Sequence, residues 1–209
     1  MTIQLQEMHP ALVHLPNALL PLAVGADVIG TITKNDPLLP FGQKAIGVAA
    51  IGAIGSAVTD LIAGEEVNVE GASEDMLITH RNLNFIATVV AGGMALWRFS
   101  HEKPNVACLG VGAVGVGLLA YTAYLGGKLV YEVGVGVGVE PAKGVYRKDA
   151  PTLKSGQIGS FAKAAGTDLV HGVQHMVQEV TKGRLIPTII ASIREQPEAS
   201  VPATAGTSA

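Results

Sequence analysis

The chain has 209 residues, of which 48% are hydrophobic, 15% charged and 4% aromatic, and its net charge is −3 at pH 7. Soluble domains carry about 25% charged residues, so this composition argues against a water-soluble globular domain. The net negative charge provides no basic surface, which excludes nucleic acid as a partner. The single cysteine, Cys108, excludes a disulfide framework and a CxxC metal or c-type haem motif within one chain.

Four long apolar runs lie in the first two thirds of the chain, and charged segments separate them. They cover residues 11–32, 45–64, 82–99 and 106–130. Each is close to the roughly 20 residues that a helix needs to cross the hydrocarbon core of a bilayer. We therefore predict an all-α fold, with residues 1–140 forming an up-and-down bundle of four transmembrane helices.

Glycine is frequent within these runs, particularly in the second and the fourth. Small residues let transmembrane helices approach closely, so close packing explains the glycines most simply. Room for a flat cofactor is the alternative.

An even number of spans places both termini on one face of the membrane. The opposite face has four cations, and the face of the termini has only two at the ends of its helices. The four cations of the opposite face are Lys34, Lys44, Arg98 and Lys103. The two on the face of the termini are Arg81 and Lys128. The positive-inside rule then predicts that both termini are extracytoplasmic.

Three histidines lie near the predicted starts of spans. His9 and His14 open the first run, and His80 opens the third. Antiparallel threading puts both starts on one face, together with Asp60 near the end of the second run and Tyr131 after the fourth. Ionisable residues at such positions are costly unless they have partners, so this face is the predicted functional end.

The two histidines of the first run are five residues apart, roughly 140° around a helix. His9 and His14 therefore cannot easily bind one centre, unless Pro10 keeps His9 in a turn before the helix. His14 and His80 are the more natural facing pair. Two carboxylates, Asp27 and Asp60, also lie in or near the spans, and for these we predict interhelical hydrogen bonds to Thr or Ser.

Several segments resemble the DUF2231 family of predicted bacterial membrane proteins. They are residues 9–16 (HPALVHLP), 79–81 (THR), 124–131 (YLGGKLVY) and 134–137 (GVGV), and the resemblance covers residues 8–137. It implies a four-span protein of the bacterial inner membrane. Members occur fused or adjacent to periplasmic redox modules, such as cytochrome c or sugar dehydrogenase domains, which suggests electron transfer and a haem.

One position departs from this pattern, because the family usually has a histidine just before the Gly-Val repeat and this chain has Val133. If the family histidine were an axial ligand, a haem would be less well supported here. If it only lined the site, His14 and His80 could still bind the iron.

A haem b suits two imidazoles that face each other across a bundle core rich in small residues. We expect His14 and His80 to bind the iron, and Arg81 and Lys128 to pair with the propionates. His9 and Tyr131 complete the predicted cofactor site. Capping of helix ends and interfacial hydrogen bonds are an equally simple role for the histidines, and another metal or a proton relay is a third.

Residues 141–209 are predicted to lie outside the membrane as a linker, an amphipathic helix and a disordered tail rich in Pro, Ser and Ala. Apolar residues at helical spacing form the stripe of that helix: Ile158, Phe161, Ala165, Leu169, Val173, Met176 and Val180. This helix could lie on the membrane or on a partner. His171 and His175 are four residues apart on its polar side, where a solvated face is the simplest interpretation and a surface metal the alternative.

The sequence thus predicts a membrane b-type cytochrome-like subunit that exchanges electrons with an extracytoplasmic or respiratory partner. The alternatives are a non-catalytic anchor or assembly subunit of a redox complex, and a small transporter or metal-handling protein. A protein partner is expected to bind residues 158–194. A homo-oligomer is a further possibility. No nucleophile, base and orienting residue are grouped in the sequence, so a stand-alone enzyme is not favoured.

Overall fold

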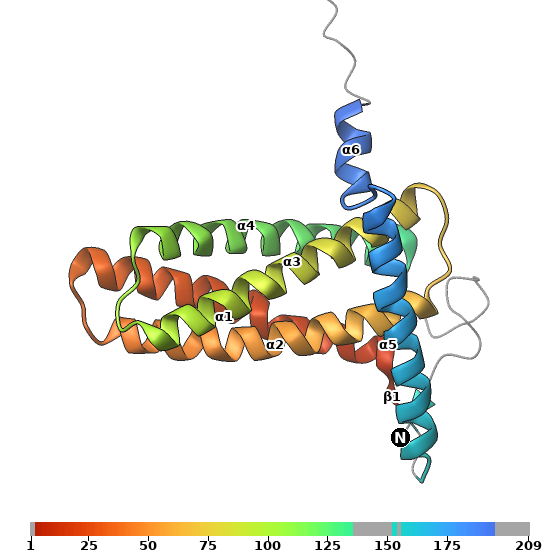
Figure 1. The fold of residues 1–209 in the computed structure, drawn as a ribbon, viewed down its shortest axis with the longest axis horizontal. Helices are drawn as coiled ribbons and strands as arrows, with labels where there is room; N and C mark the ends of the chain where they lie inside the picture. The colour runs from red at the N-terminus through yellow and green to blue at the C-terminus, as the bar shows by residue number, and fades with distance from the viewer. Residues whose placement is uncertain (1–2, 136–151, 154–155, 195–209) are drawn as a thin grey trace, which may run out of the picture.

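The computed structural model describes residues 3–135, 152–153 and 156–194, and it confirms the all-α, four-span bundle (Figure 1). The spans are α1 (Leu5–Thr33), α2 (Leu38–Glu66), α3 (Ala72–Ser100) and α4 (Val106–Lys128), and α4 continues into a short π-helix, η1 (Leu129–Val133). The four candidate membrane segments are 26 to 29 residues long. This length is sufficient to cross a bilayer.

The helices are longer than the apolar runs that predicted them. The prediction that the third helix begins with its apolar run at residue 82 was wrong, because α3 begins ten residues earlier, at Ala72, with Glu74 and Asp75 in its first turn. Acidic side chains stabilise the first turn of a helix without adding any hydropathy. As a result, His80 lies inside α3, between the second and third turns, and not at its mouth.

Small side chains form the centre of the bundle. Ala23, Ala49 and Ala91 are at most 1% exposed, and they pack with Leu20 and Ile46. Large apolar side chains point outward instead: Ile32, Ile51 and Leu96 are 73% to 75% exposed. An apolar exterior around an alanine-rich centre is typical of helices that pack closely in lipid.

A buried ion pair lies near the end of α1, the start of α2 and the end of α3. Arg98 is 0% exposed, and its Nε and Nη2 atoms donate to the two carboxylate oxygens of Asp27 at 2.8 and 3.1 Å. The remaining donors of Arg98 reach the carbonyls of Leu39, His101 and Glu102. The prediction of a Thr or Ser partner for Asp27 was therefore wrong, since a guanidinium supplies both the countercharge and bidentate geometry.

Two further helices, α5 (Ile158–Thr181) and α6 (Pro187–Arg194), pack against the other end of the bundle. A two-residue strand, β1 (Ile3–Gln4), pairs antiparallel with β2 (Thr152–Leu153). In Figure 1, α5 runs across the long helices and not along them. The predicted tail, residues 195–209, lies outside the described residues, as does most of the predicted linker.

Arg184, which follows α5, ties the C-terminal helices to the bundle. Its guanidinium lies 2.7 Å from Asp75 and 3.6 Å from Glu74 at the start of α3, and 2.6 Å from Glu179 in α5. The hydrogen bond to Asp75 raises the pKa of Arg184 above its ordinary value, with Glu179 and Glu74 adding to it against the effect of burial. A cation for these carboxylates was not predictable from the sequence, because 109 residues separate Asp75 and Arg184.

Candidate metal site

Three potential metal ligands from three helices meet at the end of the bundle against which α5 and α6 pack. His9 of α1, Asp60 of α2 and His80 of α3 each offer one ligand atom, and these atoms all lie within 4.8 Å of one another. Asp60 and His80 are buried, and His9 is partly buried. Two imidazoles and a carboxylate are a donor set that first-row transition metals bind in proteins.

Backbone carbonyls orient both imidazoles. His9 Nδ1 lies 3.0 Å from the carbonyl oxygen of Ser56, and His80 Nδ1 lies 3.0 Å from that of Thr122. A carbonyl only accepts, so in a neutral ring the proton is assigned to Nδ1 and the lone pair to Nε2. Metal-binding histidines are commonly held in this way, with the nitrogen that does not bind the ion donating to a carbonyl. His9 Nε2 then lies 3.7 Å from Asp60 Oδ1.

Asn84 closes the cluster from within α3. Its amide nitrogen lies 2.9 Å from His80 Nε2 and 3.3 Å from Asp60 Oδ2. The amide group therefore donates to the lone pair of His80 and to the carboxylate of Asp60. Without it, these two acceptors would face each other with no proton or cation between them. The predicted Thr or Ser partner of Asp60 was also wrong, because Asn84 and His9 take that place.

A glycine makes room for the buried imidazole. A Cβ atom added at Gly126 of α4 would lie 3.0 Å from His80 Cε1, whereas one added at Gly127 would meet nothing within 4 Å. The glycine pair of α4 thus has one member that sets the position of a ligand and one that does not.

A pocket of about 490 Å³ adjoins the cluster. The start of α1, the end of α2, the start of α3 and the end of α4 with η1 form its wall, and most of the lining side chains are apolar. Asn17 and His14 add polar groups, and Tyr131 lies at the wall with 89% of its surface exposed. The π-helix is an irregularity often found at functional sites, and here it supplies part of this wall.

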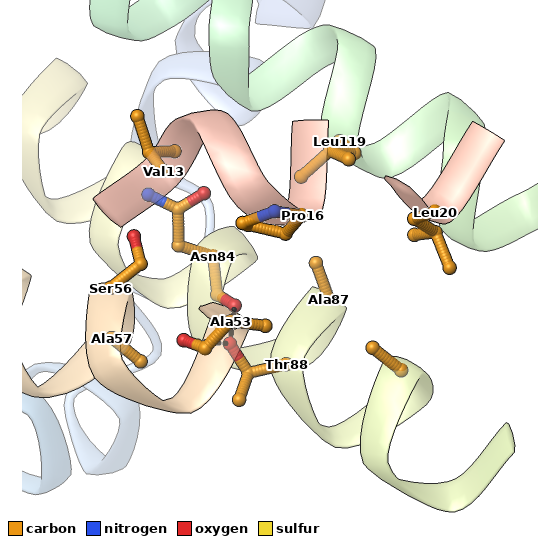
Figure 2. A pocket seen from close by; sticks show the side chains of 11 residues that line it. Val13, Pro16, Leu20, Ala53, Ser56, Ala57, Asn84, Ala87, Thr88 and Leu119 are labelled. Carbon is orange, nitrogen blue, oxygen red and sulfur yellow. Dashed lines mark hydrogen bonds between the residues drawn. The ribbon is translucent and has the colours of Figure 1, made fainter. Parts of the chain in front are cut away.

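A second, much smaller cavity lies beside the cluster. Figure 2 shows this cavity, of about 20 Å³, with Ser56 and Asn84 at one end and Thr88 hydrogen-bonded to the carbonyl of Ala53. Such a volume holds about one water molecule. The larger space beside the three ligand residues is the 490 Å³ pocket, which His9, Asp60 and His80 line.

The structure brings His9, and not His14, together with His80. His14 is exposed, lines the pocket, and its Nδ1 atom lies 2.6 Å from the carbonyl of Pro10. Because α1 begins at Leu5, Pro10 does not hold His9 in a turn, and both histidines point from one helix in different directions. The sequence offered no signal for choosing between them, since that choice depends on how α1 is rotated against its neighbours.

The remaining predicted residues contribute no atom to the cluster, although Arg81 is close enough to Asp60 for their charges to interact. Lys128 pairs with Glu132 at 3.3 Å, and Arg81 is buried but does not line the pocket. His175 bonds to Glu65 at 2.9 Å. His171 is exposed, and in the described part of the chain no group of three potential metal ligands includes either of these two histidines.

Sequence reasoning placed Asp60 on the correct face but missed its partners. Asn84 follows His80 by four residues, a spacing that places two side chains next to each other on a helix. This spacing could have identified Asn84 as a neighbour of His80. The carbonyls of Ser56 and Thr122 had no signal, because any residue type offers a carbonyl.

Comparison with known families gives one match, the family described as "Predicted membrane protein (DUF2231)", over residues 6–139. No curated protein and no solved structure matches the chain. The matched range contains the four spans, η1 and all three ligands of the cluster. It ends before α5 and α6.

Proposed function

The chain belongs to the DUF2231 family of predicted membrane proteins, and we propose that it binds one divalent transition-metal ion at the rim of its four-span bundle. His9, Asp60 and His80 are the proposed ligands. The observation that carries this proposal is the convergence of their three ligand atoms within 4.8 Å. Both Nδ1 atoms face backbone carbonyls, so both Nε2 atoms carry a lone pair. The lone pair of His80 Nε2 accepts a hydrogen bond from Asn84, and it becomes available to the ion when that amide turns aside.

The chemistry of the donor set restricts the ion. Imidazole suits zinc, iron, copper and nickel, and a single carboxylate adds a charge of −1. Calcium and magnesium prefer oxygen ligands only, so they are not expected here. Three protein ligands leave at least one coordination position for water or a small molecule, and the adjoining pocket of about 490 Å³ gives access to it.

The same contacts fit a single ion better than a haem. A macrocycle bound by His9 and His80 needs a clear plane between the two Nε2 atoms. The side chains of Asn84 and Asp60 lie there, at 2.9 Å from His80 Nε2 and 3.7 Å from His9 Nε2. An ion requires only that the Asn84 amide turn aside, and its own oxygen can then act as a further ligand.

We propose that the protein works in the bacterial inner membrane with both termini extracytoplasmic, as the charges of the short loops favour. An electron-transfer role is part of the proposal, with iron in this nitrogen and oxygen site in place of the haem iron that the family's redox neighbours suggested. The metal site then faces the same side as the partner that would exchange electrons with it.

Metal titration of the purified protein tests the proposal. The full chain is stripped with a chelator in detergent and titrated with Co²⁺, whose visible absorption reports nitrogen and oxygen ligands. We expect one ion per chain, no binding at this site by His9→Gln, and unchanged binding by His14→Gln, the matched control on the same helix. Binding that survives His9→Gln, or a Soret band that depends on His14, would contradict the proposal.

A further inference from the structure

A stripe of valines on α5 is exposed although the helix is packed on the bundle. Val170, Val173, Val177 and Val180 have 41% to 54% of their surface exposed. Their spacing of three, four and three residues places them on one face of the helix. We call these four residues the valine stripe.

The surface of α5 divides into three arcs at about 100° per residue. The first arc contacts the bundle and contains the two buried residues of α5, Asp168 and Gly172. The second arc is apolar and includes Leu169 and the valine stripe. The third arc is polar and exposed, and it contains Lys163, Thr167, His171, Gln174 and Gln178. Apolar and polar arcs thus lie on opposite sides of the contact with the bundle.

The contacts of α5 set its level along the spans. A Cβ atom at Gly172 would lie 2.5 Å from the carbonyl oxygen of Leu61, which is five residues before the end of α2. After α5, the carbonyl of Leu185 accepts a 2.9 Å hydrogen bond from Asn82, ten residues into α3. At 1.5 Å per residue, these contacts lie roughly 7 to 15 Å inside the helix ends. The segment therefore lies beside the spans, and not beyond them.

The handedness of the helix gives the direction of each arc. In Figure 1, α5 crosses in front of α2 and α3 and runs upward, while the hairpin joining α2 and α3 extends past it to the right. In a right-handed helix that runs upward with its contact face at the back, successive residues turn from the back toward the left. The arc next after the contact face therefore points left, toward the middle of the bundle. This is the apolar arc. The polar arc turns right, toward the hairpin.

We propose that α5 lies in the lipid–water interface of the bilayer that the bundle crosses, with the valine stripe against acyl chains. The polar arc then faces the headgroups and water, as in interfacial amphipathic helices. The stripe contains no aromatic or arginine side chain, the residues that anchor protein interfaces, which favours lipid over a protein partner. Lys163 is the one cation of the polar arc, so the contact with lipid is hydrophobic and does not require anionic headgroups.

Site-directed fluorescence quenching tests this placement. Single cysteines replace Val177 or Gln174 in the full chain with Cys108→Ala, and each carries a polarity-sensitive dye in phosphatidylcholine nanodiscs. We expect acyl-chain nitroxides to remove most of the emission at Val177→Cys and little at Gln174→Cys, and aqueous iodide to do the opposite. Val173→Cys and Gln178→Cys form a second pair if either first variant fails to fold.

Two outcomes would overturn the proposal. Quenching of both positions by iodide would place α5 in water. Protection of the Val177 position from both quenchers would mean that a second copy of the chain or a partner protein covers the stripe. Neither result depends on the metal site, which is tested separately.

Discussion

At the scale of single residues, the site depends on hydrogen bonds to backbone carbonyls and on the space that a glycine leaves. His80 is held by the carbonyl of Thr122 on one side and by the absence of a side chain at Gly126 on the other. The types and spacing of residues suggested that His80 was functional. They could not identify His9 as its partner. His9 and His14 lie roughly 140° apart around α1, so which of them faces His80 depends on how α1 is rotated about its axis.

Replacing Gly126 with alanine tests the fit around His80. The new Cβ atom would lie 3.0 Å from Cε1, so the ring must shift away from the position that aims Nε2 at the cluster. Loss of second-shell positioning costs about 10–100-fold in metal affinity, and we expect the affinity for Co²⁺ to fall by this factor. Gly127→Ala is the control and should bind as the wild type does. Equal affinities in both variants would count against the role of Gly126.

The buried pair of Asp27 and Arg98 yields a prediction about stability. Arg98→Met leaves the Asp27 carboxylate without its countercharge, and breaking a buried pair in this way costs about 3–5 kcal/mol. The measurement is the free energy of unfolding in detergent. Lys103→Met removes an exposed pair with Asp36, and we expect a loss of about 0–1 kcal/mol. Similar losses in the two variants would refute this account of the pair.

At the scale of elements, the C-terminal helices are attached by ion pairs, by hydrogen bonds such as that from Asn82 to the carbonyl of Leu185, and by a close backbone contact at Gly172. Hydropathy predicted an amphipathic helix at the place of α5, and it correctly gave the periodicity of the apolar stripe. It could not predict that Phe161, Leu169 and Met176 would be partly covered by the bundle while Val173 and Val180 stay exposed. Docking depends on Gly172 and Arg184, whose partners lie more than 100 residues away in the sequence.

Acid should weaken this attachment, because Glu179 holds the guanidinium of Arg184 that reaches Asp75. Burial raises the pKa of Glu179, but hydrogen bonds and charges from Lys182 and Arg184 outweigh it and hold the pKa below its ordinary value. A carboxylate with a lowered pKa stabilises the folded state above its unfolded pKa of about 4.3, and this contribution is lost as the pH falls through the lower, folded value. A spin label at Ser192→Cys in α6 should therefore stay immobile above about pH 5 and become mobile below about pH 4.

The Glu179→Gln variant is the control for this transition. It should lose the part of the pH dependence that Glu179 contributes, and the label should already be more mobile at neutral pH. A label that stays immobile at every acidic pH, or a transition near neutrality, would instead point to groups other than Glu179.

At the scale of the whole molecule, the number of spans and their antiparallel order could be predicted because both follow from apolar length. The ends of the helices could not be predicted, since α2 and α3 extend into polar sequence, where hydropathy gives no indication of a helix. The predicted division at residue 140 separates the spans from the later helices along the chain. In space α5 and α6 lie against α2 and α3, so the two parts share a surface.

The orientation of the bundle can be measured directly in cells. The α2–α3 hairpin should face outward and the α1–α2 loop inward, because cations gather near the latter. A membrane-impermeant maleimide should label Glu70→Cys in intact spheroplasts, whereas Asn35→Cys should react only after permeabilisation. Both positions are exposed in the structure, so accessibility within the protein does not bias the result. The reverse pattern would invert the proposed orientation.

The central claim, that a single ion bound by His9, Asp60 and His80 occupies the rim of the bundle, is tested most directly by X-ray absorption spectroscopy at the metal edge. The protein loaded with one equivalent of metal should give a first shell of nitrogen and oxygen atoms with outer-shell scattering from two imidazoles. His14→Gln should not change that spectrum. A shell with four coplanar pyrrole nitrogens, or scattering from fewer than two imidazoles, would contradict the assignment.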